Sequence, residues 1–138
     1  GALVVNSKIK KEVLTPGTHA STYGGNPLVC AAALAVFKTL QKDRLIQNAV
    51  ALGDFLKGRL LEFKSRYSVI KEVRGKGLMM GVELEKPGAP FADRARELGF
   101  LINCPQEKVL RIMPAITVSK TWLNKGLAIL KNVFEELK

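Results

Sequence analysis

The residues of this chain that could do chemistry are concentrated between Gly17 and Leu28. The segment reads GTHASTYGGNPL and combines hydroxyl groups with an imidazole, a phenol and a Gly-Gly pair. Asn26 is a favourable N-cap, and Pro27 suits the first position of a helix. Hydroxyls and backbone N–H groups ahead of a helix N-terminus can hold an anion, commonly a phosphate. Taken alone, the pattern favours the simpler interpretation of a turn followed by a well-capped helix.

Arg111 is the second candidate for a chemical role. It lies between the apolar residues Leu110 and Ile112 and is followed by Met113 and Pro114, which is typical of a position near the end of a strand. An arginine at such a position can bind a carboxylate through two parallel hydrogen bonds. Without further context, a solvated arginine on an edge strand is the simpler interpretation.

Apolar residues recur at helical and strand periods, and they predict the elements that would carry these candidates. A short strand and two long helices are expected in the first half, over residues 2–5, 27–41 and 44–67. Small residues along the first helix predict that it is deeply packed, with Cys30 in the core. Asp43 is the expected cap of the second helix.

The second half is predicted to be rich in strands. Two strands are expected around a turn at Gly75-Lys76-Gly77, over residues 69–75 and 78–84. A short helix and two further strands follow, over residues 91–98, 100–103 and 109–112. Ser119 is expected to cap a last helix, with Trp122 packed near its start.

This order of elements predicts an α/β fold. Its second half is an α+β small domain, in which helices cover a small and mostly antiparallel sheet, and long helices precede it. A change from long helices to strands near Ser68 predicts a domain boundary that divides the chain into residues 1–67 and 68–138.

Composition restricts the classes of function. The chain has 138 residues, of which 47% are hydrophobic, and 22 Lys and Arg against 12 Asp and Glu give a net charge of +10. That charge suggests an anionic partner, but the basic residues are dispersed and no nucleic-acid-binding motif is present, so nucleic acid is not favoured. No apolar run is long enough to span a membrane. Cys30 and Cys104 form no metal-ligand cluster, and without a secretory signal they predict a cytoplasmic protein.

Three segments resemble class III pyridoxal-phosphate-dependent aminotransferases. Residues 18–28 are similar to the family segment that follows the Schiff-base lysine. Residues 69–84 contain a stretch similar to the Val-Arg-Gly-x-Gly-Leu-Met sequence that opens the family's small domain, and residues 109–117 resemble its carboxylate-binding segment. The resemblance is closest to the branch that acts on acetylornithine and ornithine. It covers the whole chain but only the carboxyl-terminal part of such a fold-type I enzyme.

The resemblance assigns roles to three residues. It places the cofactor phosphate of the neighbouring subunit on Thr22, with Ser21 as a weaker candidate, and the substrate α-carboxylate on Arg111. It also implies that the Schiff-base lysine lies upstream of Gly1, so that the chain holds no catalytic residue. Ala115 departs from the family pattern, which often has a second proline there. His19 and Tyr23 receive no firm role.

The function implied by this resemblance is the transfer of an amino group from N-acetylornithine to 2-oxoglutarate in arginine biosynthesis. The enzyme would be a homodimer, joined through the cofactor-binding region, and the chain alone is expected to be inactive. Several alternatives stay open: another class III enzyme acting on ornithine, succinylornithine or 4-aminobutyrate, a free-standing basic binding module, or a degenerate domain kept for dimerisation.

Overall fold

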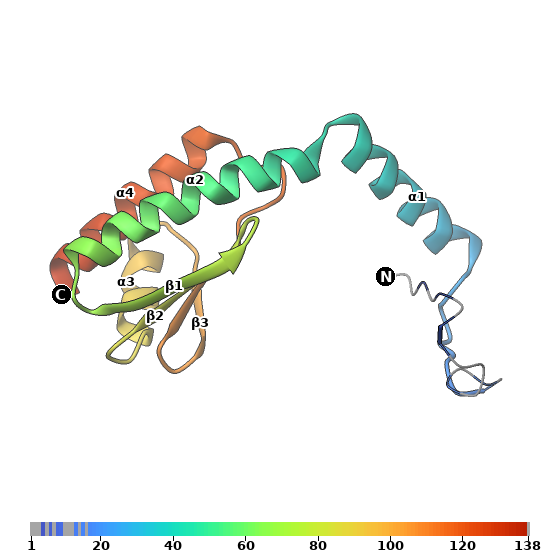
Figure 1. Cartoon of the computed structure of the whole chain (residues 1–138), viewed down its shortest axis with the longest axis horizontal. Helices are drawn as coiled ribbons and strands as arrows, with labels where there is room; N and C mark the ends of the chain where they lie inside the picture. Colours follow the sequence, from blue (N-terminus) through green and yellow to red (C-terminus); the bar gives the residue numbers. More distant parts are fainter. Residues whose placement is uncertain are drawn as a thin grey trace. The chain divides into compact units, whose positions relative to one another are not determined.

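The computed structural model describes residues 4, 6, 8, 9, 13, 15 and 17–137. The chain divides into two compact units, Gly1–Asp43 and Arg44–Lys138 (Figure 1). The strand expected over residues 2–5 lies outside the described residues, apart from Val4. The predicted boundary at 67/68 concerns the domains of a longer family fold and stays a prediction.

The first unit contains helix α1, Pro27–Lys42. Its start is as predicted, because the Asn26 side chain accepts a hydrogen bond from the N–H of Val29 at 3.0 Å. Two predictions are wrong. Asp43 ends α1, where its N–H donates to carbonyl oxygens of the last turn, and it does not cap the next helix. No residue of α1 is buried by the described residues, and Cys30 is exposed rather than in a core.

The second unit contains three helices and four strands among its described residues. They are, in chain order, α2 (Leu45–Arg66), β1 (Ile70–Lys76), β2 (Met79–Leu84), α3 (Ala89–Glu97), β3 (Asn103–Gln106), β4 (Val109–Ile112) and α4 (Lys120–Leu137). The strands form one sheet in the order β1-β2-β4-β3, and every neighbouring pair is antiparallel. Figure 1 shows α2 and α4 running side by side along the sheet. The predicted α/β architecture is confirmed.

One hydrophobic core joins the helices to a single face of the sheet. Helix α2 contributes Leu56, Leu60 and Phe63 from one stripe, and α4 contributes a matching stripe that includes Leu130 and Phe134. Each fully buried side chain of this size contributes about 1.5–3 kcal/mol to folding. These contacts fix the sheet on the helices, so the opposite face carries the residues that remain available for binding.

The opposite face of the sheet is polar and open. In β4 the buried residues Leu110 and Ile112 alternate with half-buried Val109 and Arg111, so Arg111 points away from the core. In β1 a register shift between Ile70 and Glu72 interrupts the alternation. Such a bulge re-aims side chains.

Three details of the second unit differ from the predictions. Strand β3 is Asn103–Gln106, which was expected to be partly a turn, and the predicted strand over 100–103 is wrong except for Asn103. Helix α3 begins at Ala89 because Pro90 fits its first turn. Trp122 is 64% exposed and does not pack into the core, although Ser119 does cap α4 as predicted.

Candidate functional site

The loop before α1 presents two hydroxyl groups. Ser21 and Thr22 are both exposed, and neither side chain forms a hydrogen bond with another described residue. The loop turns through Gly25, whose φ of +76° lies in the left-handed region that favours glycine. The Asn26 side-chain N–H donates to the carbonyl of Tyr23 at 2.7 Å, which fixes the end of the loop. The hydroxyls are therefore held on an ordered turn and are free to accept or donate.

The N-terminus of α1 has little donor capacity left for an anion. Pro27 has no N–H, the N–H of Val29 is bound by Asn26, and the N–H of Cys30 donates to the Asn26 carbonyl. In the first turn only the N–H of Leu28 has no partner among the described residues. An anion held here would thus depend mainly on the hydroxyls of the loop and less on the helix end.

Strand register places Arg111 in a row that crosses the whole sheet. Arg74 of β1 pairs with Gly81 of β2, Gly81 pairs with Arg111 of β4, and Arg111 pairs with Asn103 of β3. These four residues lie side by side on the open face, since paired residues of neighbouring strands point to the same side. Two arginines therefore flank a glycine that contributes no side chain between them.

The two arginines have different partners. Arg111 Nε donates to Asn103 Oδ1 at 3.1 Å, and Arg111 has no ion pair among the described residues. Arg74, by contrast, contacts two carboxylates, with Nη1 3.0 Å from Glu72 Oε2 and 2.5 Å from Glu83 Oε2. Among the described residues, carboxylates therefore balance the charge of Arg74, and none balances the charge of Arg111.

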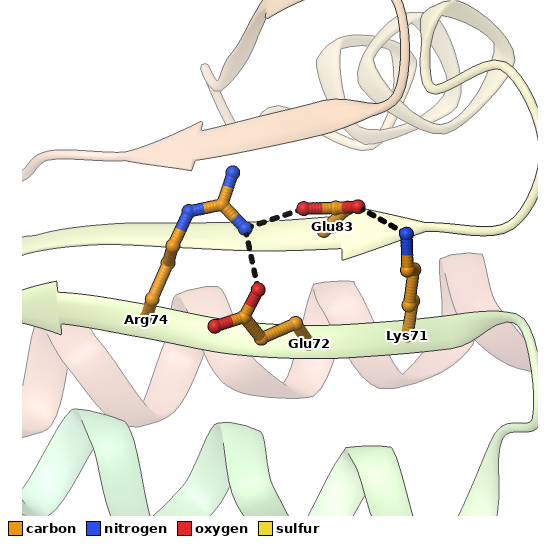
Figure 2. A network of polar contacts seen from close by, with 4 residues as sticks. All are labelled: Lys71, Glu72, Arg74 and Glu83. Carbon is orange, nitrogen blue, oxygen red and sulfur yellow. Dashed lines mark hydrogen bonds and ion pairs between the residues drawn. The ribbon is translucent and has the colours of Figure 1, made fainter.

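Figure 2 shows the network that holds Arg74, which also includes Lys71. Lys71 Nζ lies 2.9 Å from Glu83 Oε1, so Glu83 receives one cation on each oxygen. The hydrogen bonds from Lys71 and then Arg74 hold the pKa of the Glu83 carboxyl below its ordinary value. The hydrogen bond to Glu83 in turn raises the pKa of Lys71 and of Arg74. Together with Glu72, which also contacts Arg74, these three residues form a charged cluster two strands away from Arg111.

Arg111 lies at the border of two shallow hollows on the open face. One is lined by residues that include Arg74, Gly81 and Arg111, and has a volume of about 420 Å³. The other, of about 270 Å³, is lined by Leu101, Ile102, Asn103, Arg111 and Met113. Arg111 lines both hollows, and the fork of N–H donors on its guanidinium matches a carboxylate.

The structure brings together some of the residues singled out in the sequence. Ser21 and Thr22 are neighbours in one loop of the first unit, and Arg111 lies in the second unit. His19 and Tyr23 are exposed and form no side-chain hydrogen bond with another described residue.

Asn103 is the residue that the sequence did not identify. It faces Arg111 only because the register of β3 and β4 shifts between Asn103 and Gln106. A regular two-residue hairpin that pairs Gln106 with Val109 would have placed Cys104 opposite Arg111 instead. The signal that could have found Asn103 was Pro105, which has no N–H for the ladder and so favours an irregular pairing.

Two classes of site find no support among the described residues. They contain no group of three or more His, Cys, Asp or Glu side chains placed to hold a metal ion. No helix in this part of the chain is both long enough and apolar enough to cross a bilayer.

Comparison with known proteins gives one consistent family. The family described as aminotransferase class-III matches residues 1–134. The acetylornithine aminotransferase of Methanocaldococcus jannaschii is 40% identical over 138 residues, which cover 100% of this chain and 34% of that protein. The chain spans about a third of the length of the curated relatives it matches.

Solved structures agree with this match. The ornithine δ-aminotransferase of Plasmodium falciparum superimposes with a TM-score of 0.83 at 31% identity, over 91% of this chain and 34% of that one. A second match is an amine transaminase from an uncultivated Pseudomonas species, solved in its PLP-bound internal aldimine form. It gives a TM-score of 0.79 at 32% identity, over 88% of this chain and 30% of that one. The sheet and helices described above are therefore a portion of that larger fold.

Proposed function

Because the chain belongs to the class III aminotransferase family, we propose that it is the carboxyl-terminal part of an enzyme that transfers an amino group from N-acetylornithine to 2-oxoglutarate. This reaction would serve arginine biosynthesis in the cytoplasm. The environment of Arg111 is the single observation on which the proposal rests. It is an arginine without a carboxylate partner among the described residues, and it lies on the open face of a rigid sheet. In this role it binds the α-carboxylate that both substrates share.

The cofactor in this proposal is pyridoxal 5′-phosphate, which supplies the electron sink for the chemistry of the amino-bearing carbon. The donor set of the loop fits its phosphate, because Thr22 and Ser21 present hydroxyls that no described residue engages. In a homodimer formed through this region, Thr22 of one subunit is the main ligand for the phosphate of the cofactor that the neighbouring subunit holds. The lysine that holds the cofactor is provided by a segment upstream of Gly1, so the 138 residues alone have no transaminase activity.

The first experiment determines the intact mass of the native gene product in its source cells. We expect about three times 15.1 kDa, because the chain spans 34–35% of its curated relatives. The product is then assayed with 2-oxoglutarate and four amino donors: N-acetylornithine, ornithine, succinylornithine and 4-aminobutyrate. If the enzyme prefers another of these donors, that donor replaces N-acetylornithine as the assigned substrate, and the family assignment stays as it is. A native mass of 15.1 kDa, together with steep salt-dependent binding to DNA or RNA, would favour the basic binding module.

Thr22→Ala tests the phosphate assignment in the same native enzyme. We expect it to lose bound cofactor on dialysis, measured by absorbance of the cofactor. Thr22→Ser retains the hydroxyl and is the matched control, so it should keep the cofactor. Equal retention by both variants would remove Thr22 from the site.

A further inference from the structure

The hydrogen bond between Asn103 and Arg111 differs in kind from the other contacts that hold an arginine on this face. Arg111 Nε donates to the neutral amide oxygen of Asn103 at 3.1 Å. Arg74, two strands away in the same cross-strand row, is held by the carboxylates of Glu72 and Glu83. A neutral amide orients a guanidinium and leaves its charge unchanged, whereas a carboxylate orients the guanidinium and also neutralises its charge.

The geometry of this bond leaves the binding end of Arg111 free. A guanidinium has five N–H donors in a planar fork. With Nε bound to Asn103, the four N–H groups of the two Nη atoms remain. The two Nη atoms are the pair that engages a carboxylate end-on through two parallel bonds. Asn103 therefore occupies only the donor that end-on recognition does not use.

The backbone fixes the position of Asn103 itself. Asn103 pairs directly with Arg111 in the β3–β4 ladder, and the register shifts immediately after it. The half-buried thiol of Cys104 lies 2.9 Å from the Gln106 carbonyl across this irregular segment. The backbone of Asn103 is thus fixed by the ladder on one side and by a closed local turn on the other, and its exposed side chain is held by the hydrogen bond with Arg111.

We infer that Asn103 is a positioning residue, which orients Arg111 for a substrate carboxylate without placing a negative charge beside it. This inference rests on the proposed role of Arg111. It deepens that role, because it identifies the group that pre-organises the binding end. A pre-organised arginine loses less side-chain entropy when it binds.

The test uses the native enzyme that contains this chain and three variants of it. Asn103→Leu keeps the volume of the side chain and removes the acceptor, so the KM values for the amino donor and for 2-oxoglutarate should rise about fivefold to tenfold, the value of one lost hydrogen bond. The kcat should change less than about twofold, since the residue does not touch the reacting atoms. Asn124→Leu makes the same change at an exposed position of α4 and should leave both constants unchanged.

Asn103→Asp separates direction from charge. It keeps an oxygen acceptor for Nε but neutralises Arg111, so KM should rise although the hydrogen bond persists. Arginine-selective ¹⁵N NMR of the same enzyme reports the hydrogen bond directly. The Arg111 Nε–H signal is assigned by its absence in Arg111→Lys. Its proton should exchange slowly with water in the wild type and in Asn103→Asp, and rapidly in Asn103→Leu.

The outcomes distinguish this inference from the proposed function. Slow Nε–H exchange in Asn103→Leu, or fast exchange with unchanged KM values, would overturn the positioning role. If Arg111→Lys itself leaves both KM values unchanged, the carboxylate assignment fails, whatever Asn103 does.

Discussion

Gly53 of α2 lies directly against Gly77 in the turn between β1 and β2. A β-carbon on Gly53 would be 2.3 Å from the Gly77 carbonyl oxygen and 2.7 Å from its Cα, distances that no real contact allows. The neighbour is backbone and cannot rotate away. This contact sets how closely the helix approaches the hairpin that carries Arg74 and Gly81.

Gly53→Ala is therefore expected to destabilise the chain by about 1–3 kcal/mol, the usual cost of overpacking a tight contact. Gly58 is the matched control, because it lies in the same helix and a β-carbon added there would have nothing within 4 Å. Gly58→Ala should stabilise by about 0.5–1 kcal/mol through helix propensity. Urea unfolding followed by circular dichroism gives both values. Equal effects of the two substitutions would show that the close approach does not limit packing.

The Lys71–Glu83–Arg74 cluster predicts a specific response to acid. The pKa of Glu83 is lowered in the folded chain, chiefly by the hydrogen bonds from Lys71 and Arg74. A lowered carboxylate pKa stabilises the fold above the unfolded value of about 4.3, and this contribution is lost as pH falls through the folded pKa. Glu83→Gln should therefore lose less unfolding free energy between about pH 7 and pH 3 than the wild type does.

The control for this comparison is Glu107→Gln. Glu107 is exposed, and its side chain makes no ion pair with a described residue, so its substitution should leave the acid dependence as in the wild type. Urea unfolding at several pH values measures the difference. An acid dependence in Glu83→Gln as steep as that of the wild type would contradict the stabilising role of the cluster.

Local signals in the sequence were sufficient for most of the fold. The Asn26 cap, the hairpin at Gly77 and the stripes of α2 and α4 are each encoded by a few neighbouring residues, and all were predicted. The position of Arg111 on its strand followed from two flanking apolar residues. These features depend on periodicity and turn chemistry, which a single sequence displays.

Features that depend on distant partners were not predictable in the same way. Small residues in α1 were interpreted as a sign of deep packing, yet the described residues leave Cys30 exposed, because the face that a helix buries depends on what covers it. The pairing of Asn103 with Arg111 required the register shift next to Pro105, because a regular ladder would place Cys104 opposite Arg111. The place of Lys71 in the Arg74 cluster required the bulge in β1. Periodicity does not encode such irregularities of register.

Asn26→Ala is expected to loosen the first turn of α1. The side chain of Asn26 binds both the Val29 N–H, at 3.0 Å, and the Tyr23 carbonyl, at 2.7 Å. Loss of an N-cap costs about 1 kcal/mol, so the Val29 amide should exchange with solvent about fivefold faster in NMR hydrogen exchange. Asn26→Asp keeps the acceptor for Val29 and should restore most of the protection. If the Val29 amide exchanges at the same rate in Asn26→Ala and Asn26→Asp, the Asn26 cap does not stabilise this end of the helix.

Helix α1 is expected to promote self-association of the chain. Its large apolar residues are exposed, with Leu28 at 79%, Leu34 at 59% and Phe37 at 58%. Leu34 and Phe37 are three residues apart and therefore share a face of the helix. An exposed apolar surface of this kind is typical of an interface. The mass measured by light scattering should rise above 15.1 kDa as the concentration of the chain increases.

The combined substitution of Leu34→Glu with Phe37→Glu tests this surface, because two carboxylates on the same helix face oppose burial. The variant should stay at 15.1 kDa over the same range of concentration. Leu61→Glu changes a leucine on α2 that is 44% exposed and serves as the control, so its association should match the wild type. If Leu61→Glu dissociates the chain as well as the α1 variant does, or if the α1 variant still associates, the contact does not run through α1. Dissociation by the α1 variant alone would place the contact on the helix that directly follows the Thr22 loop, as the proposed homodimer requires.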